Sequence, residues 1–344
     1  MSSDRKLVRV LQGSVEKVPP VWLMRQAGRY LPEYRKLRAE AGSFWAMALT
    51  PKYAAEVTLQ PIRRFGFDAA ILFSDILTVP EALGQKVTFT EGEGPSLAPV
   101  TSTQGFNEDR VQWANYFEPV YEALRLTRAG LTPETTLLGF AGAPWTLATY
   151  LAAGAGGDEQ KAAKLSAYRD PQGFAGLLDI LGECVAFHLI RQLDAGADAV
   201  QIFDSWASGL PPALFDSVVI APTKKIVAAV RAARPNARII GFPRAATLAG
   251  YQDYVRATEV DAVSLDTAAP LSWASANLNC ALQGNLDPIV LIAGGAALDR
   301  AVDTILQATD GKPHIFNLGH GILPETPIAH VEQLLKRIHA RSQP

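Results

Sequence analysis

The stretch GADAVQIFDS, residues 196–205, decides the fold. A glycine and one further residue precede Asp-Ala, which is followed by a short apolar run and a second aspartate. GFDAAILFSD at residues 66–75 repeats this order, and VDAVSLDT at residues 260–267 repeats it without the glycine. Short runs that are β-branched or aromatic and apolar on both faces are typical of strands covered on both sides. Three copies of the pattern predict equivalent strands in a repeating fold.

Eight runs of strand character occur along the chain. They are residues 20–24, 69–74, 136–141, 199–203, 238–242, 262–265, 281–285 and 314–318. Helical spacing of apolar residues separates them, as at residues 177–193, 213–233 and 327–340. Alternating strands and helices favour parallel strands joined by right-handed crossovers. Eight such units predict a closed (β/α)8 TIM barrel, and an open doubly wound sheet is the alternative.

Helix boundaries are marked by residues with known end preferences. Thr50 followed by Pro51 predicts the start of a helix, with Thr50 as its cap. Gly66 and Gly196 fit left-handed helix ends. Residues 83–102 instead alternate in polarity and are rich in Gly and Pro, which predicts a hairpin inserted after the second strand. Because no linker divides the chain, residues 1–344 are expected to form one domain.

Composition narrows the class of protein. A net charge of −2 over 344 residues provides no global field for nucleic acid or an anionic membrane. The two cysteines, Cys184 and Cys280, lie in no metal-ligand or disulfide pattern, which indicates a reducing compartment. The first residues lack the apolar core of a signal peptide, and no apolar run has the length of a membrane span. These features predict a cytoplasmic protein.

Polar side chains follow nearly every predicted strand, at the end where barrel enzymes carry their sites. They are Arg25, Arg29, Asp75, Tyr150, Asp204, Ser205, Arg244, Asp266, Asn285, Asp287, Asn317 and His320. Some of these should be structural, since Asp and Asn also cap helices.

MRQAGRYLPEYRKLR, residues 24–38, is the most informative segment. It gathers five cationic side chains in a slightly acidic protein, and arginine grips carboxylates with a rigid fork. A solvated helix face accounts better for Arg35 and Lys36. Arg25 and Arg29 flank a Gly at the end of the first strand, which predicts a ligand with several carboxylates.

Three further positions are candidates. Asp75 lies in an apolar neighbourhood, where burying a carboxylate without a hydrogen-bond or charge partner is energetically unfavourable. We therefore expect Asp75 to have a partner or a function. His320 lies between two glycines that would let a ligand approach closely. Trp145 and Tyr150 could supply an aromatic wall and a hydroxyl. Residues 154–157, GAGG, match no phosphate-binding motif, and a mobile lid is the better interpretation. Neither a zinc constellation nor a GxSxG hydrolase motif is present.

The motifs RQAGRYLPEYR, FSDIL, GFAGAPWTL, IFDSWAS, QGNLDP and FNLGHG occur in the order found in uroporphyrinogen decarboxylases, from about residue 18 to 336. The chain therefore resembles that family. The resemblance implies a homodimeric (β/α)8 barrel that converts uroporphyrinogen III to coproporphyrinogen III without a cofactor. The implied substrate-binding residues are Arg25, Gln26, Ala27, Gly28, Arg29, Arg38, Asp75, Tyr150, Ser205 and His320, with Asp75 and Arg25 catalytic. Asp204, Trp206 and residues 241–247 depart from the family pattern.

Two alternative functions are a related enzyme and a non-catalytic carrier. A methyltransferase of the same superfamily would need a His-x-Cys and a later Cys, which this chain lacks. A tetrapyrrole carrier would keep the arginines but would have no need for Asp75 at the centre.

Overall fold

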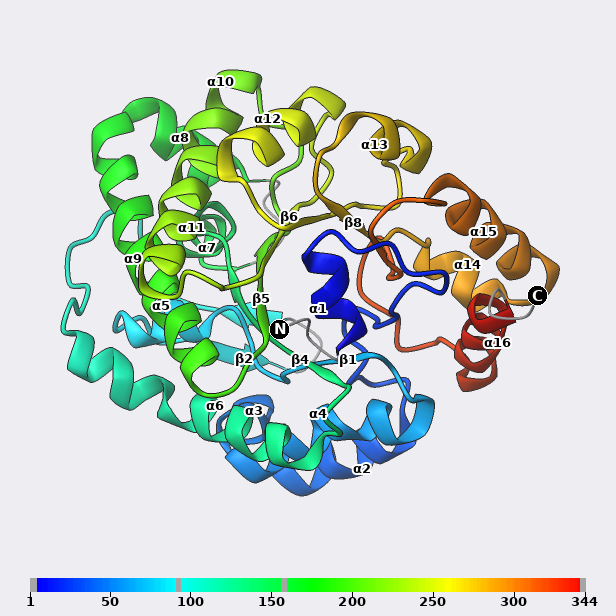
Figure 1. The fold of residues 1–344 in the computed structure, drawn as a ribbon. Helices are drawn as coiled ribbons and strands as arrows, with labels where there is room; N and C mark the ends of the chain where they lie inside the picture. The colour runs from blue at the N-terminus through cyan, green and yellow to red at the C-terminus, as the bar shows by residue number, and fades with distance from the viewer. Residues whose placement is uncertain (1–4, 91–93, 156–159, 341–344) are drawn as a thin grey trace.

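The computed structural model describes residues 5–90, 94–155 and 160–340 (Figure 1). Within them, seven strands form one sheet whose neighbours all pair in parallel and in chain order. The strands are β1 (Ala69–Ile71), β4 (Thr136–Gly142), β5 (Ala199–Asp204), β6 (Ile239–Pro243), β7 (Ala262–Ser264), β8 (Ala281–Gln283) and β9 (His314–Ile315). This order is that of a barrel, as predicted.

The eighth position is a single bridge rather than a strand. Val21 pairs in parallel with Phe316, whose amide donates to Pro20 O at 2.9 Å. On the other side, the Asp68 amide donates to Val21 O at 2.9 Å. The segment therefore lies between β9 and β1 and closes the ring. The predicted strand over residues 20–24 is this short because Pro19 and Pro20 have no amide hydrogen to donate.

Helices cover the outside of the ring (Figure 1). They are α2 (Pro32–Ala41), α3 (Phe44–Leu49), α4 (Pro51–Phe65), α5 (Thr78–Ala82), α6 (Arg110–Gly130), α7 (Pro144–Ala153), α8 (Lys161–Arg169), α9 (Pro171–Asp194), α10 (Pro212–Phe215), α11 (Ala221–Ala233), α12 (Leu248–Thr258), α13 (Leu271–Asn277), α14 (Pro288–Ala293), α15 (Gly295–Ala308) and α16 (Ile328–His339). A π-helical turn, η1 (Asp216–Ile220), joins α10 to α11.

The predicted helix ends are confirmed with one correction. Helix α4 begins at Pro51 and ends at Phe65, and Gly66 follows with a left-handed φ of 66°. Gly196, with φ 109°, follows the end of α9. Thr50 occupies the cap position of α4, but its side chain makes no capping hydrogen bond. The proline at the first position, whose missing amide needs no partner, is therefore the effective start signal.

The inserted hairpin lies where it was predicted. Strands β2 (Thr88–Thr90) and β3 (Gly94–Ser96) pair antiparallel. The Leu97 amide then donates to Gly154 O at 2.9 Å, which ties the hairpin to the end of α7. Of the predicted lid over residues 154–157, the last two lie outside the described residues.

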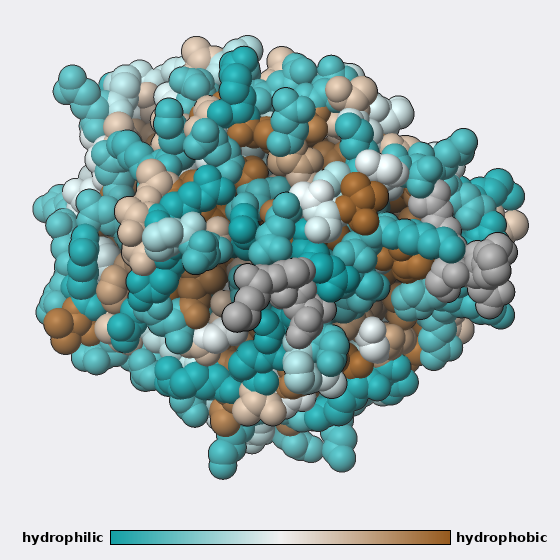
Figure 2. Space-filling model, viewed as in Figure 1, coloured by the Kyte–Doolittle hydropathy of each residue, from teal (hydrophilic) through white to brown (hydrophobic). Residues whose placement is uncertain are grey.

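Helix α1 (Lys6–Leu11) closes the amino-terminal end of the barrel (Figure 1). Its Leu7, Val10 and Leu11 join the apolar cluster inside the ring. The outer surface of this end is mostly hydrophilic (Figure 2). A site inside the ring is therefore approached from the carboxyl ends of the strands, as in barrels of this type.

Helix α9 is long and apolar enough to cross a membrane by length and composition. In the fold it packs against β4, α7 and α11, and its Leu177, Leu181 and Leu189 are fully buried. Its apolar side chains therefore form part of the protein core.

The repeated Asp-Ala pattern has a structural cause. Asp68, Asp198 and Asp261 each precede a strand, and one carboxylate oxygen of each accepts a backbone amide of the neighbouring strand at 2.8 Å. The amides received are those of Val21, Leu137 and Ile239. Each aspartate's own amide donates back to the carbonyl of the same partner. These reciprocal pairs fix the register of neighbouring strands at their amino ends.

Replacing Asp261 with Ala should lower the free energy of unfolding by about 2–3 kcal/mol, because the buried Ile239 amide loses its acceptor. Arg231 and Arg238 also lose their shared carboxylate partner. The control is Asp253→Ala, which removes an exposed ion pair with Arg256 and should change stability by less than about 0.5 kcal/mol. Equilibrium urea denaturation measures both, and equal losses would contradict the structural role of the aspartate.

Candidate active site

The side chains at the carboxyl ends of the strands follow the alternation of the sheet. Ile71, Phe203 and Phe242 belong to the apolar cluster inside the ring. Because side chains alternate between faces of a strand, Ser205 and Arg244, which directly follow β5 and β6, continue on the side of Phe203 and Phe242. Asp75 lies four residues past the end of β1, and the Arg25 charge acts on its carboxyl. These residues therefore lie at the mouth of the barrel. Arg25 and His320 join them from the segments that follow Val21 and β9.

Arg25 sits in a strained turn. Its φ of 64° is left-handed, which costs a non-glycine residue about 1–3 kcal/mol. Gln26 holds the turn: its side chain accepts from the Leu23 amide and donates to Ala69 O, both at 3.0 Å. Since Gln26 is fully buried, its side chain is occupied in positioning Arg25.

Glycines around this turn make room for protein atoms. A Cβ at Gly321 would lie 2.4 Å from Arg25 Cδ, so the arginine side chain passes directly over this residue. A Cβ at Gly319 would lie 2.3 Å from the Thr267 amide nitrogen. Both glycines beside His320 therefore allow close packing within the protein, and the predicted approach of a ligand at this position stays a prediction.

Asp75 is half-buried beside Arg25. Burial raises the pKa of its carboxyl to about 6, and the Leu77 amide and the Arg25 charge oppose this rise. The Leu77 amide donates to Asp75 Oδ1 at 2.8 Å. Glu81, on α5, raises the pKa of Asp75 further and is itself held by Tyr116 Oη at 2.5 Å. The carboxylate is thus ionised at neutral pH but poorly solvated.

His320 is half-buried among cations. Burial, together with the charges of Arg25 and Arg244, lowers the pKa of its imidazole to about 4. At neutral pH His320 is therefore uncharged, and it can donate or accept a hydrogen bond.

The arginines of the mouth lack acidic partners. No carboxylate of the described residues lies within ion-pair distance of Arg25, Arg29, Arg38 or Arg244. The charges of Arg38 and Arg29 both oppose the rise that burial causes in the pKa of the Tyr34 phenol. Arg35, by contrast, donates to Arg29 O at 2.8 Å, which supports its assignment as a structural residue.

Tyr150 lies on α7 and is half-buried. Its ring meets that of Trp206 edge-on, with 6.2 Å between centroids. The predicted wall residue Trp145 is instead fully buried and donates to Trp206 O at 2.8 Å. Trp206 therefore forms the aromatic surface beside Tyr150. The sequence showed Trp206 only as a departure from the family pattern and gave no sign that it would contact Tyr150.

Several of the predicted polar strand ends are structural. Asp204 faces away from the mouth and accepts from Thr146 Oγ1 at 2.5 Å. Asp287 caps α14 through the Ile289 amide, and Asp266 accepts from Tyr251 Oη at 2.7 Å. Asn285 and Asn317 hydrogen-bond to neighbouring backbone. The expectation that some of these residues serve the fold is confirmed.

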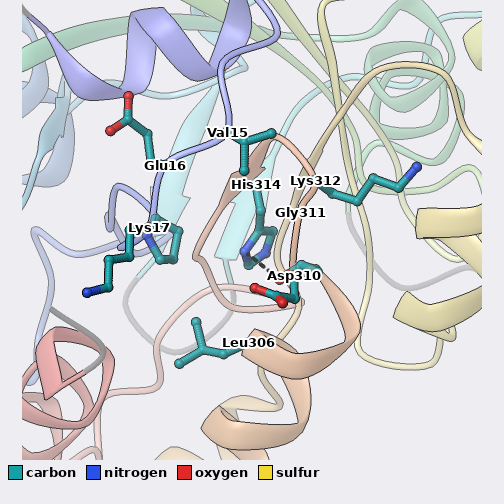
Figure 3. A pocket seen from close by; sticks show the side chains of 10 residues that line it. Val15, Glu16, Lys17, Leu306, Asp310, Gly311, Lys312 and His314 are labelled. Atoms are coloured by element: carbon teal, nitrogen blue, oxygen red, sulfur yellow. Dashed lines mark hydrogen bonds between the residues drawn. The ribbon is translucent and has the colours of Figure 1, made fainter. Parts of the chain in front are cut away.

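Other ionisable groups lie away from the mouth. A pocket of about 230 Å³ at the amino ends of the strands is lined by Lys17, Asp310, Lys312 and His314 among others (Figure 3). His314 is buried there and hydrogen-bonded to Gly284 O and Thr309 Oγ1. Among the described residues, no group of three His, Cys, Asp or Glu could hold a metal ion.

Comparison with known proteins identifies close relatives. Residues 2–341 match the family model described as uroporphyrinogen decarboxylase (URO-D). Proteins of that description from Rhizorhabdus wittichii and Brucella anthropi are 53% and 54% identical, over 98% and 97% of this chain and 98% of each relative. Among solved structures, a methyltransferase from Methanosarcina mazei superposes with a TM-score of 0.80 at 20% identity, covering 97% of both chains. The last similarity concerns the fold alone.

Asp75→Asn should increase stability at neutral pH. The folded pKa of about 6 exceeds the unfolded value of ~3.9, so folding is favoured by protonation and the wild-type chain loses stability as pH rises through 6. Asparagine keeps the acceptor for Leu77 without the charge. We expect a gain of about 3 kcal/mol at pH 7 that disappears near pH 4. Urea denaturation across this range measures it, and a loss of stability at pH 7 would contradict the assignment.

Proposed function

The chain belongs to the uroporphyrinogen decarboxylase family, and we propose that its reaction takes place at the mouth formed by Arg25, Asp75 and His320. The chain is a carboxy-lyase of haem biosynthesis that removes the four acetate carboxyl groups of uroporphyrinogen III as CO2, giving coproporphyrinogen III. The observation that supports the location is a half-buried carboxylate, Asp75, beside Arg25, an arginine that forms no ion pair with any carboxylate of the described residues.

Substrate binding follows from the charges. Uroporphyrinogen carries eight carboxylates around a ring with four pyrrole N–H groups. Arg25, Arg29 and Arg38 are free to bind carboxylates through charge-assisted hydrogen bonds. Ala27 and Gly28 border the ligand through the backbone of the same turn. Ser205 and Tyr150 offer hydroxyl groups, and neutral His320 offers a hydrogen bond without adding charge.

Asp75 supplies the central electrostatic contribution. Its carboxylate accepts the pyrrole N–H bonds and draws the ring into a dome. Protonation of the pyrrole carbon adjacent to the one that bears the acetate side chain creates a cationic iminium. Loss of CO2 then sends the electron pair of the breaking carbon–carbon bond into this cation, which gives a neutral ring with an exocyclic methylene. A second proton converts the methylene to methyl, and loss of the first proton from the ring carbon restores the aromatic pyrrole. Because Asp75 is poorly solvated, its negative charge stabilises the cation more strongly than it would in water.

The first proton has three possible sources. Arg25 lies beside both Asp75 and His320, so it is one donor despite its high pKa. A water molecule held by Arg25 and a carboxyl group of the substrate are the others. A positioned donor of this kind contributes roughly 10²–10⁴-fold in rate.

The remaining expectations rest on the family. We propose that residues 1–344 form one catalytic domain, that two copies associate as a homodimer, and that the protein works in the cytoplasm. No cofactor or metal takes part in the proposed steps.

The direct test is anaerobic incubation of the purified protein with uroporphyrinogen III in the dark, with a chelator present. Oxidised products are separated by carboxyl number. We expect hepta-, hexa-, penta- and tetracarboxylate species in succession. Binding without any change in carboxyl number would instead indicate a carrier.

The pH dependence of kcat/KM should reflect the ionisation of the Asp75 carboxyl. Since the carboxylate is the active form, kcat/KM should fall as pH drops below about 6. Replacing His320 with Asn should leave this break in place, because the imidazole is uncharged down to about pH 4. If the pH at which kcat/KM falls shifts in the His320 variant, the titrating group is the histidine.

Asp75→Asn should lower kcat by at least ~10²-fold while leaving substrate binding measurable. The matched control is Asp204→Asn, since Asp204 is a buried carboxyl with a pKa raised to about 7 that faces Thr146. Its activity should remain within a few-fold of wild type. Anaerobic steady-state kinetics measures both variants, and equal losses would show that Asp75 acts through the fold.

A further inference from the structure

Arg244 occupies the mouth from the side opposite Arg25. Around the ring the order is the Val21 segment, β1, β4, β5, β6, β7, β8 and β9. Strand β6 is therefore the fourth neighbour of the Val21 segment in either direction. Arg25 follows the Val21 segment and Arg244 follows β6, so their backbones face each other across the mouth.

The turn that carries Arg244 is held in an unusual conformation. Ala245 has a left-handed φ of 55°, one of four non-glycine residues with positive φ in the described chain, and Arg25 is another. The Ala245 amide donates to Asp266 Oδ2 at 3.0 Å, and the same oxygen accepts from Tyr251 Oη at 2.7 Å. The Arg244 amide donates to Asp204 O at 3.0 Å. A buried carboxylate and the end of β5 thus fix the backbone on both sides of the guanidinium stem.

Among the described residues, the Arg244 guanidinium makes one long hydrogen bond, from Nη1 to Ser205 O at 3.4 Å. Arginines at the other end of the barrel differ, because Arg128, Arg231 and Arg238 each pair with an aspartate that precedes a strand. Arg244 is half-buried, lies over the site residue Ser205 and acts with Arg25 on His320. A half-buried cation without an anion is unfavourable unless a ligand supplies one.

Resting on the proposed function, we propose that Arg244 binds a carboxylate of the substrate and so holds the edge of the ring opposite the Arg25–Arg29 turn. Uroporphyrinogen carries carboxylates on every side. Arginines on one side alone would leave the far edge of a flexible ring unrestrained above Asp75. A cation on each side fixes the ring over the central carboxylate.

Arg244→Gln should raise the KM for uroporphyrinogen III by roughly 10–100-fold, because one charge-assisted hydrogen bond to the substrate is lost. Turnover at saturation should fall much less, because Asp75 is unchanged. Arg244→Lys, which keeps a charge but loses the two-pronged contact, should fall between the two. The matched control is Arg256→Gln on neighbouring α12, an exposed arginine that should leave KM unchanged.

A second measurement does not depend on turnover. Removing the Arg244 charge should raise the pKa of His320 in the free protein, as followed by NMR titration of its ring protons. Thermal denaturation checks that each variant is folded, and if the Gln variant is not, Arg244→Met and Arg244→Lys replace it. An unchanged KM in folded Gln or Met variants, or an unchanged His320 pKa, overturns the proposal. Absence of any decarboxylation by the wild-type protein in the same assay would instead overturn the function on which it rests.

Discussion

The structure depends on the reciprocal hydrogen bonds between aspartates and backbone at the amino ends of the strands. Asp68, Asp198 and Asp261 each accept an amide of the neighbouring strand and donate their own amide back to it. A slip of one residue would turn every side chain of a strand to the other face. By fixing the register at one end, these pairs determine which residues point into the mouth at the other. Positions 205 and 244, directly after β5 and β6, lie at the mouth for this reason.

The site combines several features that are unfavourable for folding. Arg25 and Ala245 adopt left-handed backbone, and Asp75 is ionised in surroundings that raise its pKa. Arg25 and Arg244 face each other across the mouth, and neither forms an ion pair with a carboxylate of the described residues. Buried groups hold the two left-handed turns. Gln26 holds the turn at Arg25, and Asp266 with Tyr251 holds the turn at Ala245. Such strain is tolerated where the surrounding structure over-determines it, and it prepares the site for an anionic ligand with a developing positive charge.

Much of this arrangement follows from the sequence. The Asp-Ala repeats predict the strands and the barrel, and the polar residues after each strand predict where the site lies. Hydrophobic pattern alone predicts a strand over residues 20–24, but Pro19 and Pro20, which have no amide hydrogens to donate, already mark this segment as a poor strand, and it forms a single bridge. The pattern could not separate Trp145, buried in the core, from Trp206, which lies against Tyr150. Arg244 was visible as a strand-end residue, but its significance comes from the turn at Ala245 and from its place opposite Arg25, which are properties of the folded ring.

In the proposed reaction, the substrate ring lies over the mouth with its centre on Asp75. The most direct measurement is an anaerobic crystal structure of the protein with coproporphyrinogen III bound. We predict that the pyrrole nitrogens surround the Asp75 carboxylate at hydrogen-bonding distance, about 2.7–3.2 Å, and that carboxylates of the ring meet arginines on its edges. A ring bound elsewhere, or one whose nitrogens face away from Asp75, would contradict the account.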